Sequence, residues 1–257
     1  MIDTHCHLDT PAFDADREAV IARALDAGVV GILVPAIRPR TWPHLVALVH
    51  AHAAHLRAAV GIHPQIVPEL ADDELAGDLA DRIAEAARAA GAVAIGECGL
   101  DGGTAAPYVQ ENVFRAHVRA ARAVGLPLVV HVYRAHDAAP RILRDEGARD
   151  VGGILHSYSG GADLVGVYRD LGMAFSFAGP ITYPNARRPL GAARAVPAQL
   201  LLAETDAPDQ APAPYRGGRC EPAYLPAVIA GLAAARGEDV PAVSALVTAN
   251  ARRILTW

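Results

Sequence analysis

The chain has 257 residues, more than the ~150 of one typical domain but fewer than two such domains would need. Hydrophobic residues make up 52% of it and aromatic residues 5%, which excludes a disordered chain and predicts a core of Ala, Val, Leu and Ile. The 23 basic residues, all arginine, against 28 acidic ones give a formal net charge of −5, which argues against extended binding to duplex nucleic acid.

The cysteine content and the hydropathy pattern point to a soluble intracellular protein. The three cysteines, Cys6, Cys98 and Cys220, are too few for a disulfide framework. The longest uncharged apolar run, residues 28–37, is about half of a membrane span. We therefore expect a cytoplasmic protein that does not contact a membrane, and we favour a monomer.

Apolar, β-branched segments recur along the chain and alternate with longer segments of helical periodicity. The predicted strands are Ile2–Leu8, Val29–Ile37, Ala58–His63, Val93–Leu100, Leu126–Tyr133, Gly153–Ser157, Met173–Ala178 and Leu200–Thr205. Helices are predicted between them, among them Asp14–Ala27, Asp73–Ala90 and Tyr108–Val124, each followed by a glycine that can end a helix. Near-continuous apolar strands separated by helices are typical of a parallel sheet covered by helices.

This pattern predicts the α/β class and a single-domain (β/α)8 TIM barrel over residues 1–257. Eight strand–helix units fit this length better as a closed barrel than as an open doubly wound sheet. No Gly-x-Gly-x-x-Gly motif follows the first predicted strand, which disfavours dinucleotide binding. The Pro- and Gly-rich stretch 207–222 follows the eighth strand, where a barrel carries functional loops.

The clearest chemical signal is His5-Cys6-His7 at the end of the first predicted strand. Residues two apart on a strand face the same side, so the two imidazoles should converge while Cys6 points away. Further ligand-type residues stand at or near the ends of other predicted strands: Glu97, His131, His156 and Asp206. Strand ends of a barrel meet at one face, and four His with two carboxylates exceed what one four-coordinate ion needs.

The count predicts two adjacent divalent ions with Glu97 as a candidate bridge between them. The alternative is that these polar groups only satisfy one another in the mouth of the barrel. A second histidine cluster has no such placement, because it follows a helical pattern in which residues two apart lie on different faces. We therefore predict that its members lie on the surface: His44, His50, His52 and His55.

Over its whole length the sequence resembles the TatD family of metal-dependent hydrolases. The matching motifs, in family order, are Asp3-Thr4-His5-Cys6-His7-Leu8-Asp9, Gly61-Ile62-His63-Pro64, Gly96-Glu97-Cys98-Gly99-Leu100-Asp101, Leu126-Pro127 through His131, His156-Ser157-Tyr158-Ser159-Gly160 and Glu204-Thr205-Asp206-Ala207-Pro208. The resemblance implies a metal site of His5, His7, Glu97, His131, His156 and Asp206. It also implies that Asp206 and Glu97 act in catalysis, with Asp206 orienting or deprotonating the attacking water, and that His63 contacts substrate beside the metals.

Several residues differ from the family pattern and affect the substrate pocket rather than the ligands. Gly102-Gly103 follows Asp101 where an aromatic residue is common, and His131 is followed by Tyr133 and Arg134 where an Arg two residues on is common. Cys220 stands where Asn is usual. We predict that Arg134 and Arg219 contact a nucleic-acid strand and that Arg38 and Arg40 are solvated surface charges. Candidate rings for stacking on bases are Tyr133, Tyr158, Tyr183 and Tyr215.

The predicted function is hydrolysis of phosphodiester bonds by metal-activated water. Family members are described as deoxyribonucleases that act on single strands from the 3′ end, so a short single-stranded DNA end is the expected substrate. Two divalent ions are expected, with Zn, Mn, Ni or Fe suited to the mixed ligands and Mg to phosphate chemistry. The absence of lysine disfavours the phosphotriesterase and lactonase relatives, whose bridge is a carboxylated Lys. Two alternatives remain open: a metal-dependent amidohydrolase or esterase acting on a small molecule, and a metal-binding scaffold without catalysis.

Overall fold

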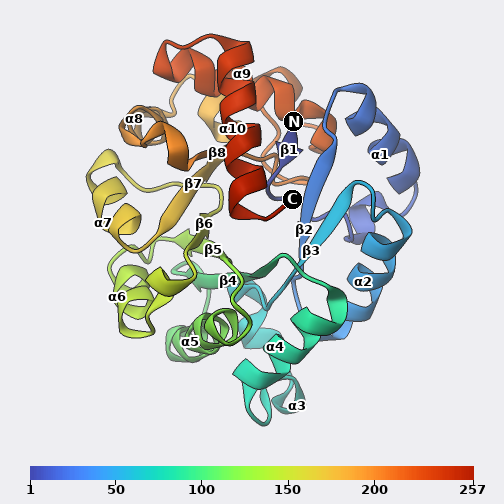
Figure 1. Cartoon of the computed structure of the whole chain (residues 1–257), viewed down its shortest axis with the longest axis vertical. Coiled ribbons are helices and arrows are strands. Elements are labelled where there is room, and N and C mark those ends of the chain that lie inside the picture. The colour runs from blue at the N-terminus through green and yellow to red at the C-terminus, as the bar shows by residue number, and fades with distance from the viewer.

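Eight parallel strands form the centre of the molecule and helices surround them (Figure 1). This computed structural model describes all 257 residues. The strands pair in the order of the sequence: β1 Ile2–Asp3, β2 Gly31–Pro35, β3 Leu56–Val60, β4 Ala94–Asp101, β5 Leu128–Tyr133, β6 Gly153–Leu155, β7 Met173–Phe177 and β8 Leu201–Ala203. All eight predicted strands are therefore confirmed, most of them shorter than the apolar segments that predicted them.

The ring closes between β8 and the segment that follows β1. The amide of Thr4 donates to the carbonyl of Ala203 at 3.3 Å, and the amide of His7 donates to the carbonyl of Ala207 at 2.8 Å. Cys6 pairs with Ala207 as an isolated parallel bridge. The predicted (β/α)8 barrel is confirmed, with its last seam made by single bonds rather than by a ladder.

The helices cover the outside of the strands. They are α1 Arg17–Asp26, α2 Trp42–Ala51, α3 Asp72–Leu75, α4 Leu79–Ala90, α5 Pro107–Val124, α6 Ala138–Asp145, α7 Val165–Asp170, α8 Arg187–Ala195, α9 Leu225–Arg236 and α10 Val240–Ile254. Short 3₁₀ helices lie in the connections. The helices predicted around α1 and α5 are confirmed within a few residues.

The single long helix predicted for Asp73–Ala90 is wrong, because the chain breaks into α3 and α4. Gly77 has a φ of 73°, a left-handed conformation that interrupts a right-handed helix. The carboxylate of Asp78 then accepts hydrogen bonds from the amides of Ala80 and Asp81 at 3.0 and 3.2 Å and starts α4 as an N-cap.

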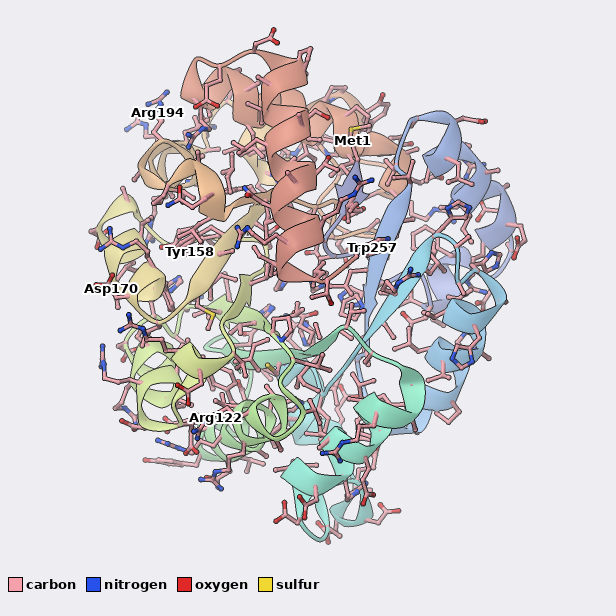
Figure 2. All side chains as sticks on the ribbon, viewed as in Figure 1. Met1, Arg122, Tyr158, Asp170, Arg194 and Trp257 are labelled. Atoms are coloured by element: carbon pink, nitrogen blue, oxygen red, sulfur yellow. The ribbon has the colours of Figure 1, made fainter.

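The barrel end at which the strands begin is filled by apolar side chains. Each strand contributes one residue to this layer: Ile2, Leu33, Ala59, Ala94, Val129, Ile154, Ala174 and Leu202. Ala251 and Leu255 of α10 pack against the layer and cover it, and Figure 1 views the molecule from this covered end. The C-terminal Trp257 lies against β2, where a Cβ on Gly31 would come within 2.6 Å of its ring (Figure 2). We call the layer formed by the eight strand residues the apolar plug.

Two expectations about single residues are wrong. Arg38 is only 8% exposed and pairs with Glu74 at 2.9 Å, because the loop after β2 folds beneath α3, so it is not a solvated charge. Tyr158 is also buried, and its hydroxyl donates to the carbonyl of Gly161 at 3.0 Å, so its ring has no face free for a base.

The cysteines and the outer helices complete the description of the fold. All three cysteines are free and buried. None of the ten helices is long and apolar enough to cross a bilayer. The labelled arginines Arg122 and Arg194 lie on helices of the outer ring (Figure 2).

Candidate metal centre

At the opposite end of the barrel, two histidines that follow β1 meet the carboxylate of Glu97. The Nε2 atoms of His5 and His7 are 3.2 Å apart, and they lie 3.0 and 3.2 Å from Glu97 Oε2. Asp3 holds the segment of His5 and His7 in place, because its carboxylate accepts hydrogen bonds from the amide of His5 at 3.2 Å and from the hydroxyl of Thr205 at 2.6 Å. This bond joins the end of β1 to the segment after β8.

Glu97 lies inside β4 rather than at its end, which corrects the strand-end expectation for this residue. The pairing of β4 with β5 changes register between Ile95 and Cys98, and such an irregularity re-aims a side chain. Glu97 is fully buried and points into the barrel, while the Cys98 thiol faces the carbonyl of Val129 at 3.4 Å.

The second oxygen of Glu97 faces a second pair of histidines. Glu97 Oε1 lies 3.0 Å from His131 Nδ1 and 2.8 Å from His156 Nε2. These two nitrogens are themselves 3.0 Å apart. One carboxylate therefore stands between two clusters of imidazole nitrogens, with one oxygen directed at each.

Asp206 faces the first of these clusters. Its Oδ1 is 3.6 Å from His5 Nε2 and 3.9 Å from His7 Nε2, and its amide donates to the carbonyl of His5 at 2.9 Å. Its other oxygen accepts a hydrogen bond from the side-chain amide of Gln210. Asp206 has a φ of 55°, a left-handed conformation that is uncommon outside glycine and is found in active sites.

Hydrogen bonds at the far ring nitrogens assign the tautomers of three histidines. His7 Nδ1 donates to the carbonyl of Pro35 at 3.3 Å, His131 Nε2 to Asp101 at 3.2 Å, and His156 Nδ1 to Glu204 at 3.3 Å. In each ring the nitrogen remote from Glu97 therefore carries a proton. The nearer nitrogen is thus the one left to offer a lone pair to a metal, the arrangement found in histidines that ligate metals.

His63 has the opposite arrangement. Its Nδ1 accepts a hydrogen bond from the amide of Gln65 at 3.1 Å, which leaves the proton on Nε2. That Nε2 lies 3.0 Å from Glu97 Oε1, so His63 donates toward the carboxylate instead of offering a lone pair. In this state His63 is a hydrogen-bond donor at the centre and not a ligand.

The donor set fits divalent metal. Three groups have their ligand atoms within 4.8 Å of one another: His5, His7 and Glu97; His63, Glu97 and His131; and His5, His156 and Glu204. Glu97 Oε2 is buried and makes no hydrogen bond, although two imidazole nitrogens lie within 3.2 Å of it. Donor atoms that approach without bonding are expected where they share an ion, and nitrogen with carboxylate oxygen suits transition metals.

The groups around Glu97 and Asp101 keep both of these buried carboxylates ionised. Burial alone would raise the pKa of Glu97, but the surrounding imidazoles of His156, His63 and His5 hold it well below its ordinary value. The hydrogen bond from His131, followed by that from Gln65, holds the pKa of Asp101 well below its usual range despite burial.

A cavity of about 710 Å³ opens above the two clusters. It is lined by His7, Thr10, Pro11, Ala12, Ile37, His63, Gln65, Ile66, His131, Val132, Tyr133, His156, Ser157, Ser159, Asp206, Pro208, Asp209 and Gln210. No arginine is among them. Apart from the Tyr133 phenol, the ionisable side chains that line this cavity are those of its His and Asp residues.

The two predicted arginine contacts lie outside this lining. Arg134 is exposed and follows Tyr133, with its guanidinium 5.0 Å from the centre of the Tyr133 ring. Arg219 is held by Asp16 and Glu221 at 2.8 and 2.9 Å and lies over the ring of Phe13. The guanidinium of Arg219 is therefore engaged in joining the loop after β8 to the region of α1.

Sequence reasoning gave no role to four residues that hold the site in place. Asp101 accepts a hydrogen bond from His131, and Glu204 accepts one from His156. Both carboxylates stand in the quoted motifs, GECGLD and ETDAP, close in sequence to the predicted ligands Glu97 and Asp206, and this closeness could have revealed them. Gln65 donates to Asp101 at 2.8 Å, and Gln210 donates to Asp206. A lone glutamine in a loop carries no sequence pattern that reveals such a contact.

Comparison with known proteins identifies the family of the chain. Residues 2–256 match the family described as TatD related DNase. The chain belongs to this family. One relative is an uncharacterized metal-dependent hydrolase, YabD of Bacillus subtilis. It is 33% identical to this chain over 99% of this chain and 98% of its own length. The protein is thus a member of a family of metal-dependent hydrolases.

Two further relatives extend the comparison to activity and to structure. A protein of Pectobacterium parmentieri named 3′-5′ ssDNA/RNA exonuclease TatD is 31% identical, over 99% of this chain and 98% of its own. The crystal structure of YjjV, a TatD homologue from Escherichia coli, superposes with a TM-score of 0.91 at 30% identity and covers 100% of this chain and 98% of YjjV. The fold and the family are therefore in agreement.

Proposed function

We propose that this protein is a divalent-metal-dependent deoxyribonuclease that removes nucleotides from the 3′ end of single-stranded DNA. The observation that carries the proposal is the placement of Glu97, which directs one carboxylate oxygen at each of two histidine clusters. Two adjacent divalent ions, which these clusters would hold, are a common arrangement for in-line displacement at phosphorus. The relative named as a 3′-5′ ssDNA/RNA exonuclease supports the polarity and the substrate.

The ligands divide into two sets that share Glu97. His5, His7 and Asp206 would hold one ion with Glu97 Oε2, and His131 and His156 would hold the other with Glu97 Oε1. Bound divalent ions supply Lewis-acid activation of water and neutralise charge on the phosphoryl oxygens. The ligand chemistry suits Zn, Mn, Ni or Fe, and Mg matches the phosphate substrate.

Asp206 and His63 are the proposed catalytic and substrate-contacting groups. Asp206 takes the proton from water as the water oxygen bonds to phosphorus, and the bond from phosphorus to the 3′ oxygen breaks. The departing 3′ oxygen gains a proton from solvent, so that one water is consumed for each bond cleaved. His63 keeps its proton on Nε2 and donates a hydrogen bond to a phosphoryl oxygen, stabilising negative charge beside Glu97.

Metal-dependent cleavage of an end-labelled strand tests this proposal. Metal-stripped protein is given 5′-labelled single-stranded DNA, and Mg, Mn, Ni, Fe or Zn is added back singly. We expect a ladder that shortens from the 3′ end with at least one ion and is absent in Asp206→Asn. Full activity of a metal-loaded Asp206→Asn protein would contradict the assignment of the base.

The lining of the cavity favours a second candidate function, the hydrolysis of a small ester or amide. A polyanionic strand is usually bound by guanidinium groups, and no arginine lines this cavity. The same metal centre can polarise a carbonyl group. If the metal-loaded protein leaves DNA and RNA intact but cleaves members of a panel of small esters and amides, this second function replaces the first.

We also propose that one chain forms the complete catalytic unit. All six proposed ligands come from the same chain, so no partner has to complete the centre, and a monomer is the expected state. Three buried free thiols suit a reducing compartment such as the cytoplasm. Sedimentation of the active protein checks the oligomeric state.

A further inference from the structure

The mouth of the cavity carries one aromatic ring that is neither buried nor used to hold the fold. Tyr133, the last residue of β5, is the only Phe, Tyr or Trp among the lining residues, and it is 40% exposed. Its hydroxyl makes no hydrogen bond, whereas the hydroxyls of Tyr158, Tyr168 and Tyr183 are each bonded within the chain. The ring is therefore free to meet a ligand.

The neighbouring loop after β4 leaves space for this ring. Asp101 pairs with Tyr133 across β4 and β5, and the amide of Gly102 donates to the Tyr133 carbonyl at 2.7 Å. A Cβ on Gly102 would lie 2.6 Å from the Arg134 carbonyl oxygen, so a larger residue does not fit there without a shift. A Cβ on Gly103 would touch the Tyr133 ring at 3.5 Å. Gly103 thus keeps a side chain away from the exposed ring, and Gly102 allows the close approach of the two chain segments.

Arg134 places a cation beside the same ring. Its backbone has a φ of 51°, an uncommon left-handed conformation, and its guanidinium lies 5.0 Å from the Tyr133 ring centre. No carboxylate pairs with it, in contrast to Arg38 and Arg219. The guanidinium of Arg134 is therefore free to bind an anion, unlike those of Arg38 and Arg219.

We propose that Tyr133 and Arg134 form a nucleotide subsite, in which the ring stacks on a base next to the cleaved bond and the guanidinium binds the following phosphate. Aromatic rings stack on any base with little sequence preference, and an arginine beside the ring adds a phosphate contact. The subsite would supply the cation that the cavity lining lacks. This inference rests on the proposed nuclease function and names the residues that recognise the strand.

Binding to matched oligonucleotides tests the subsite. The probes are a fluorescent hexathymidylate and an abasic strand of equal length, both with phosphorothioate linkages that resist hydrolysis, added to the metal-loaded protein. We expect Tyr133→Ala to weaken binding of hexathymidylate about tenfold and to leave binding of the abasic strand unchanged. Tyr133→Phe should bind as the wild type does, because the hydroxyl has no partner. Tyr108→Ala, at a tyrosine 82% exposed on α5, is the control and should change neither affinity.

Arg134→Ala should weaken the binding of both probes and reduce the dependence of log Kd on log salt by about one unit. Arg144→Ala, at an exposed position of α6, is its control. The subsite is refuted if Tyr133→Ala binds hexathymidylate as tightly as the wild type, if it weakens both probes equally, or if the wild type binds neither.

Failure of the subsite and failure of the nuclease proposal give different results. Cleavage of DNA by the wild type with unchanged KM in Tyr133→Ala leaves the nuclease standing and removes the subsite. Base-dependent binding through Tyr133 without cleavage by any ion removes the nuclease and keeps a nucleotide-binding site.

Discussion

The two ends of the barrel are built by the same eight strands and carry opposite kinds of side chain. At the end where the strands begin, the apolar plug contains one residue from each strand and is covered by α10. At the other end the interior holds His5, Glu97, His131 and His156, all buried or nearly so, beneath an open cavity. The first end stabilises the barrel by excluding water. The second keeps lone pairs and charges together at a cost in stability, which a bound ion would offset. Stability and chemistry should therefore respond to different substitutions.

The largest effect is expected at Glu97. Glu97→Gln removes the only carboxylate shared by both clusters, so bound metal per chain should fall and the hydrolytic kcat should drop about 10³-fold or more. Metal content by mass spectrometry and kcat measure the two effects, with the exposed Glu85→Gln of α4 as control. A fully active Glu97→Gln protein would show that the two clusters do not depend on a bridge.

The apolar plug should show the reverse behaviour. Leu33→Ala leaves a cavity among fully buried neighbours and should lower the free energy of unfolding by about 2–5 kcal/mol. Urea unfolding measures this loss, and the exposed Val30→Ala just before β2 is the control. Metal content and kcat of the folded Leu33→Ala protein should stay at the wild-type values. A selective loss of metal would mean that the two ends are coupled.

His117, a buried histidine outside the metal centre, allows a test of stability against pH that does not depend on the proposed ligands. His117 on α5 accepts a hydrogen bond from the amide of Ile62 at 2.9 Å, and burial lowers its pKa to about 4. The His117 imidazole takes up a proton near pH 6.5 in the unfolded chain and only near pH 4 in the folded chain. The contribution of His117 to the free energy of unfolding is therefore complete above pH 6.5 and is lost as the pH falls toward 4. This contribution to the free energy of unfolding amounts to about 3 kcal/mol.

His117→Gln should lose this part of the pH dependence while retaining a hydrogen-bond acceptor for the Ile62 amide. Unfolding by urea at pH 7 and pH 5 measures the slope. The surface variant His50→Gln, exposed on α2, should keep the slope of the wild type. An unchanged slope in His117→Gln would show that other groups carry the acid sensitivity.

The smallest effect is expected at Gln210, which donates a hydrogen bond to Asp206 and accepts one from the hydroxyl of Ser157 at 2.8 Å. Gln210→Leu removes the hydrogen bond that orients the Asp206 carboxylate, so kcat should fall roughly tenfold with little change in KM. Steady-state kinetics separates the two constants, and Gln199→Leu, exposed before β8, is the control. A change in KM alone would place Gln210 in substrate binding instead.

Sequence reasoning reached the barrel and the members of the centre because both depend on periodic or local patterns. Apolar runs separated by helical segments suffice for eight strands, and His5-x-His7 encodes two side chains on one face. Glu97 was placed at a strand end, and the structure has it inside β4, because a register irregularity leaves no mark in the sequence.

The parts that escaped prediction depend on contacts between distant segments. Arg38 was expected on the surface because its partner, Glu74, is 36 residues away and lies in a helix that the sequence merged with α4. The tethering of Asp206 by Gln210 likewise depends on an uncommon left-handed backbone, since both residues have φ near 55°. Such a conformation is uncommon for residues other than glycine, so the residue types alone do not predict it at these positions.

The seam between the segment after β1 and Ala207 has a consequence for how the protein is made. His5 and His7 leave the ribosome first, and the residues that fix them, Thr205 through Ala207, follow about 200 positions later. At roughly 10 residues per second, about twenty seconds of synthesis separate the two. A nascent chain therefore carries His5 and His7 long before the last of the six proposed ligands, Asp206, is made, and hydrolytic activity is expected only when translation is nearly complete.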